Sequence, residues 1–538
     1  MIENALNLAY TYLNANYKTE EVTEMCDAIR IIAREPDFKF EIIGEQKAFA
    51  YDRTQDMLSK LNEKESIRKK KGVYYTPVDL VNFILINCVK SLYGKLNPQN
   101  IASLNLEEIP YKSFAKQKTI FDPTCGAGEF LLAAANMKFS LWTMHTGLTP
   151  ATAINIISSI KGNDINIESV IITELRLFLC AIKWCNRVNY MDLANLLSEN
   201  FTTYDFVTGI PPIKGKFNII IGNPPYVEDS KSGLSLEVKY GNIYANVLKN
   251  ASNKLETNGS MGFVIPLSYI STPRMQRIRN DLFSTLPEQY ILSYADRPDC
   301  LFDSVHQKLC VLIGKNRRSE KQVYTSNYHY WYNDERKNLF SNAHVIKNNF
   351  WMDDFIPKLG NVYDRDIFRK VLMPKNNTSV YENSRDGEES VFLNRREAFW
   401  MKAYRTFVDD PEYKVFSYND PGEADYCYCL INSSLFWWYW ICVSDCWHVS
   451  KELNGFRAPK IENYELATRM ANSLRDKLEA TKVYVGTRQT EYEYKHKECL
   501  EEIHAIDDFV NSAFGLSEEE CTYIKEFALR YRTSGGTD

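Results

Sequence analysis

Four consecutive residues, Asn223, Pro224, Pro225 and Tyr226, directly follow an apolar run at 217–221 that is typical of a buried strand. Two successive prolines fix φ and remove N–H donors, so this proline turn is rigid and presents carbonyl oxygens. The Asn223 amide oxygen and the Pro224 carbonyl could accept hydrogen bonds from an exocyclic amine of a nucleobase. Tyr226 offers an aromatic face for a base taken out of its stack. A rigid loop without chemistry has the same local pattern, so both interpretations stay open for the turn alone.

A second candidate site is the glycine loop, residues 122–128, which reads Asp-Pro-Thr-Cys-Gly-Ala-Gly between an apolar run and an amphipathic stretch. Gly126 and Gly128 let the backbone approach a ligand closely. Asp164 follows the next apolar run and could bind two ribose hydroxyls, although an ordinary turn residue fits the same pattern. The loop lacks the third glycine of the dinucleotide fingerprint, which favours a nucleoside ligand without pyrophosphate.

In this order the motifs resemble the gamma class of amino-methylating DNA methyltransferases, especially the adenine enzymes of type I and type IIG restriction–modification systems. The resemblance extends over residues 72–314 and more loosely to the C-terminus. It implies a direct in-line displacement by the amine, without a covalent enzyme intermediate, so Cys125 is interpreted as a small residue of the glycine loop. The order of several blocks is more specific than any single one of them.

The resemblance also implies which residues hold the cofactor, S-adenosylmethionine. Residues 72–77 are similar to the first cofactor motif of this class, and the glycine loop is similar to the loop that holds the methionine moiety. Asp164 would bind the ribose and Ile165 would pack on the adenine ring. Asp205 would accept from the adenine amino group, with Phe206 stacked beside it. The implied cofactor-binding set is Tyr75, Thr76, Pro77, Asp122, Thr124, Gly126, Gly128, Asp164, Ile165, Asp205, Phe206 and Asn223.

The Asn-Pro-Pro-Tyr form goes mainly with adenine in this class, which implies a catalytic role for Asn223, Pro224, Pro225 and Tyr226. The resulting prediction is a site-specific N6-adenine DNA methyltransferase that acts on a flipped adenine in duplex DNA, within a restriction–modification or phage-defence system. Methylation of cytosine N4, of RNA or of a protein glutamine stays an alternative, as does a catalytically silent DNA-binding scaffold. A nuclease is not expected, because Pro36-Asp37 and residues 45–47 are spaced too tightly for that pattern.

The residues that would contact DNA are less sharply marked. The class often has an aromatic wall for the flipped base on a hairpin late in the catalytic domain, and here Phe302 and His306 are both candidates. The aromatic run 435–440 and residues 444–448 resemble recognition segments, although a buried core is the simpler interpretation of that run. Polar residues after a predicted loop are better candidates for base or phosphate contacts. These are His448, Lys451, Asn454 and Arg457.

Alternating apolar runs and amphipathic stretches over 72–315 predict an α/β domain with a Rossmann-like, doubly wound and mostly parallel sheet, as the resemblance implies for class I S-adenosylmethionine-dependent methyltransferases. The runs 290–294 and 308–314 are predicted to pair antiparallel at one edge. The predicted domains are an N-terminal helical segment (1–66), the methyltransferase domain (67–318), an α+β target-recognition domain (319–460) and a C-terminal helical region (461–538).

Composition narrows the setting further. The net charge of −5 is mildly against a nucleic-acid partner, but local clustering of basic side chains matters more than the sum. Thirteen cysteines without a framework indicate free thiols in a reducing compartment, and Cys442, Cys446 and His448 lack a fourth ligand for a metal. The longest apolar run is far below the ~20 residues that span a bilayer. We therefore expect a cytoplasmic protein without metal or membrane contact, whose partners are duplex DNA and a restriction subunit, a specificity subunit or a second copy.

Overall fold

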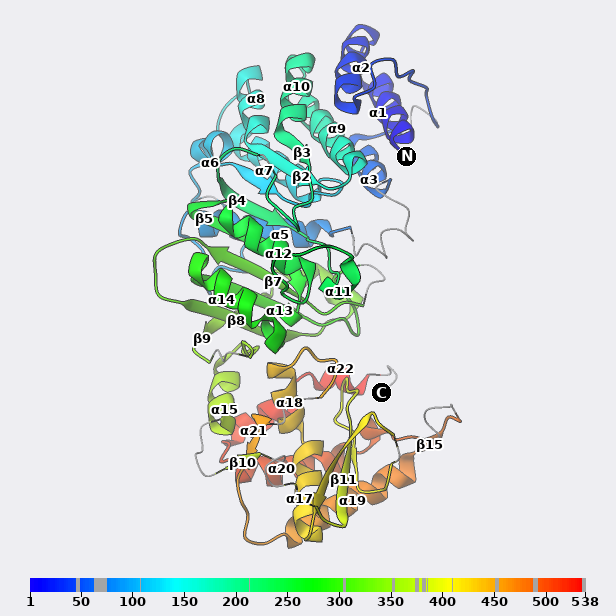
Figure 1. Cartoon of the computed structure of the whole chain (residues 1–538), viewed down its shortest axis with the longest axis vertical. Coiled ribbons are helices and arrows are strands. Elements are labelled where there is room, and N and C mark those ends of the chain that lie inside the picture. The colour runs from blue at the N-terminus through cyan, green and yellow to red at the C-terminus, as the bar shows by residue number, and fades with distance from the viewer. Residues whose placement is uncertain are drawn as a thin grey trace.

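The computed structural model describes residues 1–44, 49–61, 75–106, 108–211, 213–302, 306–350, 354–372, 377–379, 384, 386–408, 410–449, 454–486 and 492–534. Predictions that fall on residues 45–47, 72–74 and 303–305 or on Lys451 lie outside these ranges. Two lobes follow one another along the long axis of the molecule: a sheet lobe built from the first part of the chain, and a C-terminal lobe below it in Figure 1.

A mixed nine-stranded sheet forms the centre of the sheet lobe, in the order β3-β2-β1-β4-β5-β7-β6-β8-β9. Its strands are β1 (Ile120–Asp122), β2 (Ile160–Asp164), β3 (Phe201–Thr203), β4 (Phe217–Gly222), β5 (Leu255–Pro266), β6 (Glu288–Tyr294), β7 (Leu309–Lys315), β8 (Gln322–His329) and β9 (Ile346–Asn348). The first five strands in this order, from β3 to β5, pair in parallel. Strand β7 runs antiparallel to both of its neighbours, β5 and β6. The α/β fold class predicted from the apolar runs is confirmed.

The helices of this lobe connect and cover the strands. They are α1 (Ile2–Asn16), α2 (Thr19–Ala33), α3 (Tyr51–Lys60), α5 (Val78–Leu92), α6 (Tyr111–Gln117), α7 (Glu129–Thr143), α8 (Pro150–Ser158), α9 (Ile167–Trp184), α10 (Tyr190–Asn200), α11 (Asp229–Ser232), α12 (Ile243–Asn253), α13 (Ser268–Ser271) and α14 (Gln276–Thr285). Helices α5, α7 and α9 pack side by side along the sheet, and α1 to α3 pack on α9 and α10 at the N-terminal end of the lobe.

Loops at the carboxyl ends of β1, β2 and β4 meet at one edge of the sheet. Strand β1 lies between β2 and β4, which is the point where the strand order reverses. In open α/β sheets this switch point is where ligands bind. Asn166 begins α9 just after β2 by accepting from the Glu168 amide at 3.0 Å, and Asn242 begins α12 by accepting from the Tyr244 amide at 3.3 Å. Such N-caps stabilise a helix by about 1 kcal/mol and fix the loop before it.

The sheet differs from the prediction in its extent. Strands β6 and β7 pair antiparallel as expected, but β7 lies inside the sheet between β5 and β6. Strand β8 pairs in parallel with β6, and β9 pairs with β8, so the sheet continues beyond the predicted boundary at 318. These two strands are rich in Tyr, Asn and His with an irregular apolar pattern, which hides them in the sequence.

The C-terminal lobe combines helices with small antiparallel sheets. Its helices are α15 (Val362–Leu372), α17 (Pro421–Asn432), α18 (Ser434–Val443), α19 (Glu465–Thr481), α20 (Leu500–Ala513), α21 (Glu518–Glu526) and α22 (Leu529–Thr533). Its strands are β10 (Thr378–Ser379), β11 (Glu389–Asn394), β12 (Ala403–Tyr404), β13 (Tyr413–Tyr418), β14 (Arg457–Ala458), β15 (Val483–Tyr484) and β16 (Tyr492–Glu493). Helices α19 and α20 pack on α17, and α20 also packs on α18, so the predicted boundary at 460 divides one lobe.

Every residue of α18 is buried, so the simpler interpretation of the aromatic run at 435–440, a buried core, is confirmed. In α19 the buried stripe is Ala467, Ala471, Leu474 and Leu478, whereas Leu466 is 37% exposed. The small alanines let α19 lie close to α17. In the described part of the chain, no helix combines the length and the apolar character needed to cross a bilayer.

Candidate active site

The proline turn leaves the carboxyl end of β4 beside the glycine loop that follows β1. The Asn223 amide nitrogen donates to Thr76 Oγ at 3.2 Å, and its amide oxygen accepts from the Tyr226 hydroxyl. The same hydroxyl lies 2.8 Å from the Val264 carbonyl of β5. The structure therefore brings Thr76, from the first predicted motif, next to Asn223 across 147 positions of the sequence. The Asn223 amide oxygen, which is the atom predicted to accept from a target amine, therefore faces Tyr226.

The glycine loop is held in a form that only small residues permit. Gly126 and Gly128 have φ of +53° and +86°, in the left-handed region. A Cβ on Gly128 would lie 2.6 Å from Thr173 Cγ2 of α9. Thr173 Oγ donates to the Gly126 carbonyl at 2.8 Å, so the same threonine that excludes a side chain also fixes the loop. The backbone of the loop is thus open to the cavity beside it.

Asp164 links the ends of β1 and β2. One carboxylate oxygen accepts from the Gly126 amide and the other from the Asn166 amide, each at 2.9 Å. Each oxygen of an ionised carboxylate has more than one acceptor site, so further donors can bind there. Asp205, after β3, is held in the same manner by the Val207 amide at 3.0 Å. Both carboxylates therefore have fixed orientations at the edge of the sheet.

A first cavity of about 490 Å³ lies over these loops. Residues from all the loops line it: Pro123, Thr124, Gly126, Asn163, Asp164, Ile165, Asn166, Tyr204, Asp205, Phe206, Val207, Asn223, Pro225, Val227, Lys231, Ser232, Leu234 and Ile243. Ile165 is 64% exposed here, an uncommon position for a large aliphatic side chain. This volume falls in the range of small-molecule sites, and an exposed aliphatic face beside two carboxylates suits a nucleoside.

Several predicted cofactor residues lie behind this cavity rather than in its wall. Asp122 is buried and accepts from the Thr124 amide at 3.0 Å, and burial raises the pKa of its carboxyl well above the usual value. Phe206 lines the cavity, but its side chain is almost fully buried and packs against Phe121 of β1, with ring centroids 5.8 Å apart. Tyr75, Pro77 and Gly128 are not among the lining residues. These side chains shape the loops, which is a different role from ligand contact.

Asn163 is a site residue that the sequence analysis passed over. Its side chain is buried and donates to the Pro123 and Tyr204 carbonyls, each at 2.9 Å, and accepts from Thr202 Oγ at 2.7 Å. It thereby ties together the loops after β1, β2 and β3. The signal was present in the amide next to Asp164, but one sequence cannot show that its partners come from two other strands.

A second cavity of about 540 Å³ lies on the other side of the proline turn. It is lined by Tyr226, Val227, Glu228, Lys231, Asn242, Pro266, Leu267, Ser268, Arg274, Gln307, Lys308, Asp445 and Trp447. Val227 and Lys231 line both cavities, so the two spaces meet at the turn, with Asn223 on one side and Tyr226 on the other. This arrangement can place two ligands end to end at Asn223.

Tyr226 lines the second cavity, but four other residues predicted to contact the target base or DNA do not. Phe302 is only 2% exposed, and His306 is exposed with Nδ1 at 3.0 Å from the Asp296 carbonyl; neither lines the second cavity. Asn454 is exposed, and Arg457 lies in β14 with its guanidinium donating to the Asn377 carbonyl at 3.3 Å. Lys308 and Trp447 are the residues that the structure brings to this place instead.

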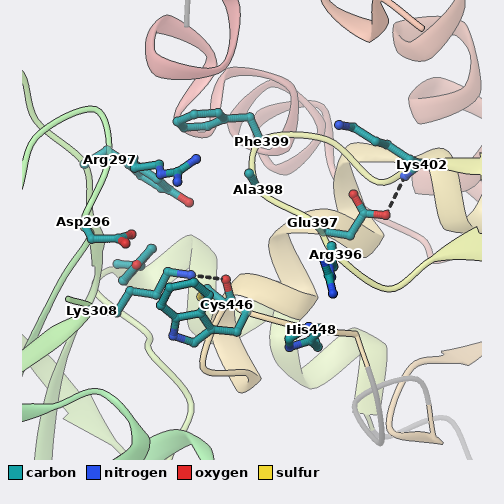
Figure 2. Close-up of a pocket in the computed structure, with 13 residues that line it drawn as sticks. Asp296, Arg297, Lys308, Arg396, Glu397, Ala398, Phe399, Lys402, Cys446 and His448 are labelled. Atoms are coloured by element: carbon teal, nitrogen blue, oxygen red, sulfur yellow. Dashed lines mark hydrogen bonds between the residues drawn. The ribbon is translucent and has the colours of Figure 1, made fainter. Parts of the chain in front are cut away.

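An interlobe cleft of about 470 Å³ adjoins the second cavity and shares Lys308 and Trp447 with it. Figure 2 shows Arg297 on the sheet-lobe side and Phe399 and Arg396 on the opposite side, with His448 further along. His448 is thus the predicted recognition residue that reaches this cleft. Burial raises the pKa of Glu397 well above its usual value and so favours its neutral form, which leaves Arg297, Lys308, Arg396 and Lys402 as an excess of positive charge.

A known protein family matches the part of the chain that contains the proline turn. Residues 158–297 match the sequence model of the Eco57I restriction-modification methylase family. This stretch is therefore similar to a restriction-modification methylase domain. The matched region contains Asp164, Asp205, the proline turn and most of the second cavity's sheet-lobe wall, and so confirms the family resemblance predicted from the motifs. No curated protein sequence matches this chain significantly.

Solved structures similar to this chain include two restriction–modification enzymes and one methyltransferase. The Type IIL enzyme MmeI in complex with DNA is 13% identical over 88% of this chain and 81% of its own, with a TM-score of 0.49. The Type ISP enzyme LlaBIII bound to DNA is 11% identical over 88% and 47%, with a TM-score of 0.48. A putative class I S-adenosylmethionine-dependent methyltransferase from Listeria monocytogenes is 12% identical over 63% and 97%, with a TM-score of 0.35.

The first structures matched are longer than the region that this chain resembles. The chain covers 34%, 36% and 47% of their lengths. Residues 158–297 are therefore the part of the chain for which a family similarity is found.

Proposed function

We propose that this protein transfers a methyl group from S-adenosylmethionine to the exocyclic N6 of an adenine flipped out of duplex DNA. The observation that carries the proposal is the position of the proline turn, since residues 223–226 separate two cavities that meet at Val227 and Lys231. One cavity offers the donors and acceptors of a nucleoside site, and the other has room for a base. A methyl donor and an acceptor amine can then approach one another at Asn223.

The first cavity fits S-adenosylmethionine on the chemistry of its walls. Asp164 and Asp205 present oriented carboxylates for the ribose hydroxyls and the adenine amine, and Ile165 presents an aliphatic face for the ring. The glycine loop leaves backbone exposed for the methionine moiety, with Thr124 at its rim. When bound there, the cofactor supplies an activated methyl group on a sulfonium.

The proline turn would orient the amine that attacks this methyl. Asn223 Oδ1 and the Pro224 carbonyl are acceptors for its two N–H groups, which favours a nitrogen whose lone pair is available. The Tyr226 hydroxyl now occupies Asn223 Oδ1, so the entering amine replaces that hydrogen bond, and the Val264 carbonyl can retain the hydroxyl. Thr76 accepts from the Asn223 amide nitrogen and so fixes the amide with its oxygen toward Tyr226. Orientation and preplaced acceptors of this kind supply most of the catalysis.

The acceptor is proposed to be DNA because of the surroundings of the second cavity. Lys231, Arg274 and Lys308 line it together with two acids, Glu228 and Asp445. The interlobe cleft adds Arg297, Arg396 and Lys402 beside Asp296 and Glu397, so basic side chains outnumber acidic ones over the two spaces together. Positive side chains around a base-sized space are the expected setting for phosphates on either side of a flipped nucleotide. A restriction or specificity subunit, or a second copy of the chain, would be a further partner within a restriction–modification or phage-defence system.

The test is transfer of a labelled methyl group from S-adenosylmethionine to unmethylated genomic DNA, with total RNA and total protein from the same cells as competing acceptors. Label is expected in DNA alone, at a rate that Asn223→Ala abolishes and that Asn349→Ala, at an exposed asparagine outside the cavities, leaves unchanged. Label in RNA or in a protein glutamine would mean that RNA or protein, and not DNA, is the methyl acceptor. Bound cofactor and bound DNA without any transfer would leave the scaffold as the function.

A further inference from the structure

The second cavity contains an aromatic side chain whose exposure stands out. Trp447 is 46% exposed, whereas the other tryptophans in the described ranges are buried or half-buried. It comes from the C-terminal lobe, directly after α18, and it lines both the second cavity and the interlobe cleft. Exposed tryptophans at the edge of a cavity are typical of surfaces that a ligand or partner covers.

The turn that carries Trp447 is fixed by its own backbone. Cys446 has φ of +58°, a region that a residue with a Cβ adopts only under constraint. The Cys446 amide donates to Ser444 Oγ at 3.0 Å, and the Trp447 amide donates to Asp445 Oδ1 at 3.2 Å. These bonds hold the strained conformation that turns the indole out of the lobe.

Two lysines from earlier in the chain also hold this turn. Lys358 donates to the Ser444 carbonyl at 2.6 Å, and Lys308, just before β7, donates to the Cys446 carbonyl. The ammonium of Lys308 also lies 3.8 Å from the centroid of the Trp447 ring, a cation–π contact, and Figure 2 shows this lysine reaching Cys446. Lys308 of the sheet lobe and Lys358, in the segment between β9 and α15, therefore hold the backbone of this turn, and Lys308 also contacts the Trp447 ring.

Trp447 and Tyr226 are the two aromatic side chains among the described residues that line the second cavity. They come from different lobes, Tyr226 from the proline turn after β4 and Trp447 from the turn after α18. Phe302 is buried away from it and His306 does not line it, so neither supplies a ring there. A flat base of the proposed substrate can be covered on one face by Tyr226 and on the other by Trp447.

We propose that Trp447 stacks on the flipped target base, opposite Tyr226, and so forms the second wall of the target pocket. This inference rests on the proposed function, because it names a residue that contacts the same substrate. The pocket would then be complete only when the C-terminal lobe is docked on the sheet lobe. Base capture would depend on the lobe that the sequence predicts to recognise DNA.

The test compares Trp447→Ala, Trp447→Phe and Phe407→Ala in the full chain. Phe407 is an exposed aromatic of the same lobe that lines none of the three cavities, which makes it a matched control. Methylation kinetics are measured on a synthetic duplex that contains the target site mapped with the wild-type protein. A second duplex has a mismatch opposite the target adenine, which lowers the cost of flipping.

Because base–aromatic stacking contributes strongly per base, Trp447→Ala should lower kcat/KM on the matched duplex by about 5- to 150-fold. The phenylalanine variant should restore most of this loss and Phe407→Ala should show none. The mismatch should narrow the gap between Trp447→Ala and wild type, since a base that flips readily depends less on stacking. Affinity for S-adenosylmethionine should stay within twofold of wild type.

Two results would overturn the inference while leaving the proposed function intact. One is a Trp447→Ala variant that methylates the matched duplex as fast as wild type. The other is a loss that is equal on matched and mismatched duplexes and accompanied by a lower melting temperature, which would indicate a purely structural role. A wild-type protein that binds cofactor and methylates no DNA would overturn the proposed function itself, and the inference with it.

Discussion

The two cavities that meet at the proline turn are built in different ways. The first is made from loops that leave neighbouring strands, and each loop is held by contacts such as Gly126 to Asp164 that follow from short motifs. The second needs Trp447 and Lys308, which lie 139 positions apart and come from different lobes. A motif can specify a loop, but only the docking of two lobes can make the second wall. The four variants below test this contrast, from the largest expected effect to the smallest.

Asn223→Ala should have the largest effect, because it removes the acceptor proposed for the target amine at the turn between the two cavities. A fall in methyl transfer of about 10²- to 10³-fold is expected, as for loss of one preplaced catalytic hydrogen bond. Affinity for S-adenosylmethionine, measured by titration calorimetry, should change little, since the glycine loop and Asp164 remain. Equal losses of cofactor affinity and of methyl transfer would mean that Asn223 acts only through binding of the cofactor.

Gly128→Ala should damage the first cavity specifically. The new Cβ would lie 2.6 Å from Thr173 Cγ2 in a backbone conformation that disfavours side chains, so a cost of about 1–3 kcal/mol in stability is expected, with weaker cofactor binding. Gly147→Ala is the control, since nothing lies within 4 Å of its Cβ and its φ is not in the left-handed region. Denaturant unfolding and cofactor titration measure both effects. Unchanged cofactor affinity in Gly128→Ala would show that the loop tolerates a side chain.

Lys358→Met should weaken the second cavity and spare the first. Lys358 is buried at the contact between the lobes, where burial lowers its pKa, and its loss leaves the Ser444 carbonyl without this donor. Such a lost hydrogen bond costs about 1–3 kcal/mol, and DNA methylation should fall by roughly 5- to 100-fold. Lys347→Met, at an exposed lysine of β9, is the control. If the affinity for the cofactor fell as much as methylation, the claim that the two cavities are held by different contacts would be wrong.

The smallest effect concerns the C-terminal lobe itself, at the start of α18. Asp507 accepts from the Ser434 amide at the start of α18, and burial raises the pKa of its carboxyl to about 6 from 3.8. Because the folded pKa is the higher one, the stabilising contribution is complete below about pH 4 and is lost as the pH rises to about 6. Asp507→Asn should remove this dependence, a difference of roughly 1–3 kcal/mol between pH 4 and 7 in denaturant unfolding. Identical pH profiles for the variant and wild type would contradict it.

The sequence predicted the first cavity well for a physical reason. Strand ends, glycines at positive φ and a following helix cap are local features, so apolar runs such as 217–221 and the spacing of Asp122 to Gly128 predict their geometry. Local pattern did not predict that the side chains of Asp122 and Phe206 would be almost fully buried. Exposure depends on neighbours from other strands, which one sequence does not reveal.

The second cavity and the sheet edge were predicted poorly for the converse reason. Apolar and polar residues alternate irregularly along β8 and β9, and β8 contacts both the sheet and the C-terminal lobe. Helix α18 is buried on all sides, so its aromatic residues show no exposed face. Phe302 is a candidate because of its place in the chain, yet its side chain packs inward. Trp447 lies in the segment 444–448 that resembles a recognition segment, but the sequence does not place it beside the proline turn. The contacts that expose Trp447 come from Lys308 of the sheet lobe and from Lys358, between β9 and α15.

The central claim is that the proline turn directs methylation to the exocyclic amine of adenine in DNA. Mass spectrometry of the nucleosides from genomic DNA, after incubation with S-adenosylmethionine and either wild-type protein or Asn223→Ala, tests it most directly. We predict N6-methyladenine with the wild-type protein, none above background with the variant, and no N4-methylcytosine with either. N4-methylcytosine alone, or N6-methyladenine that persists at the wild-type level in Asn223→Ala, would contradict the account.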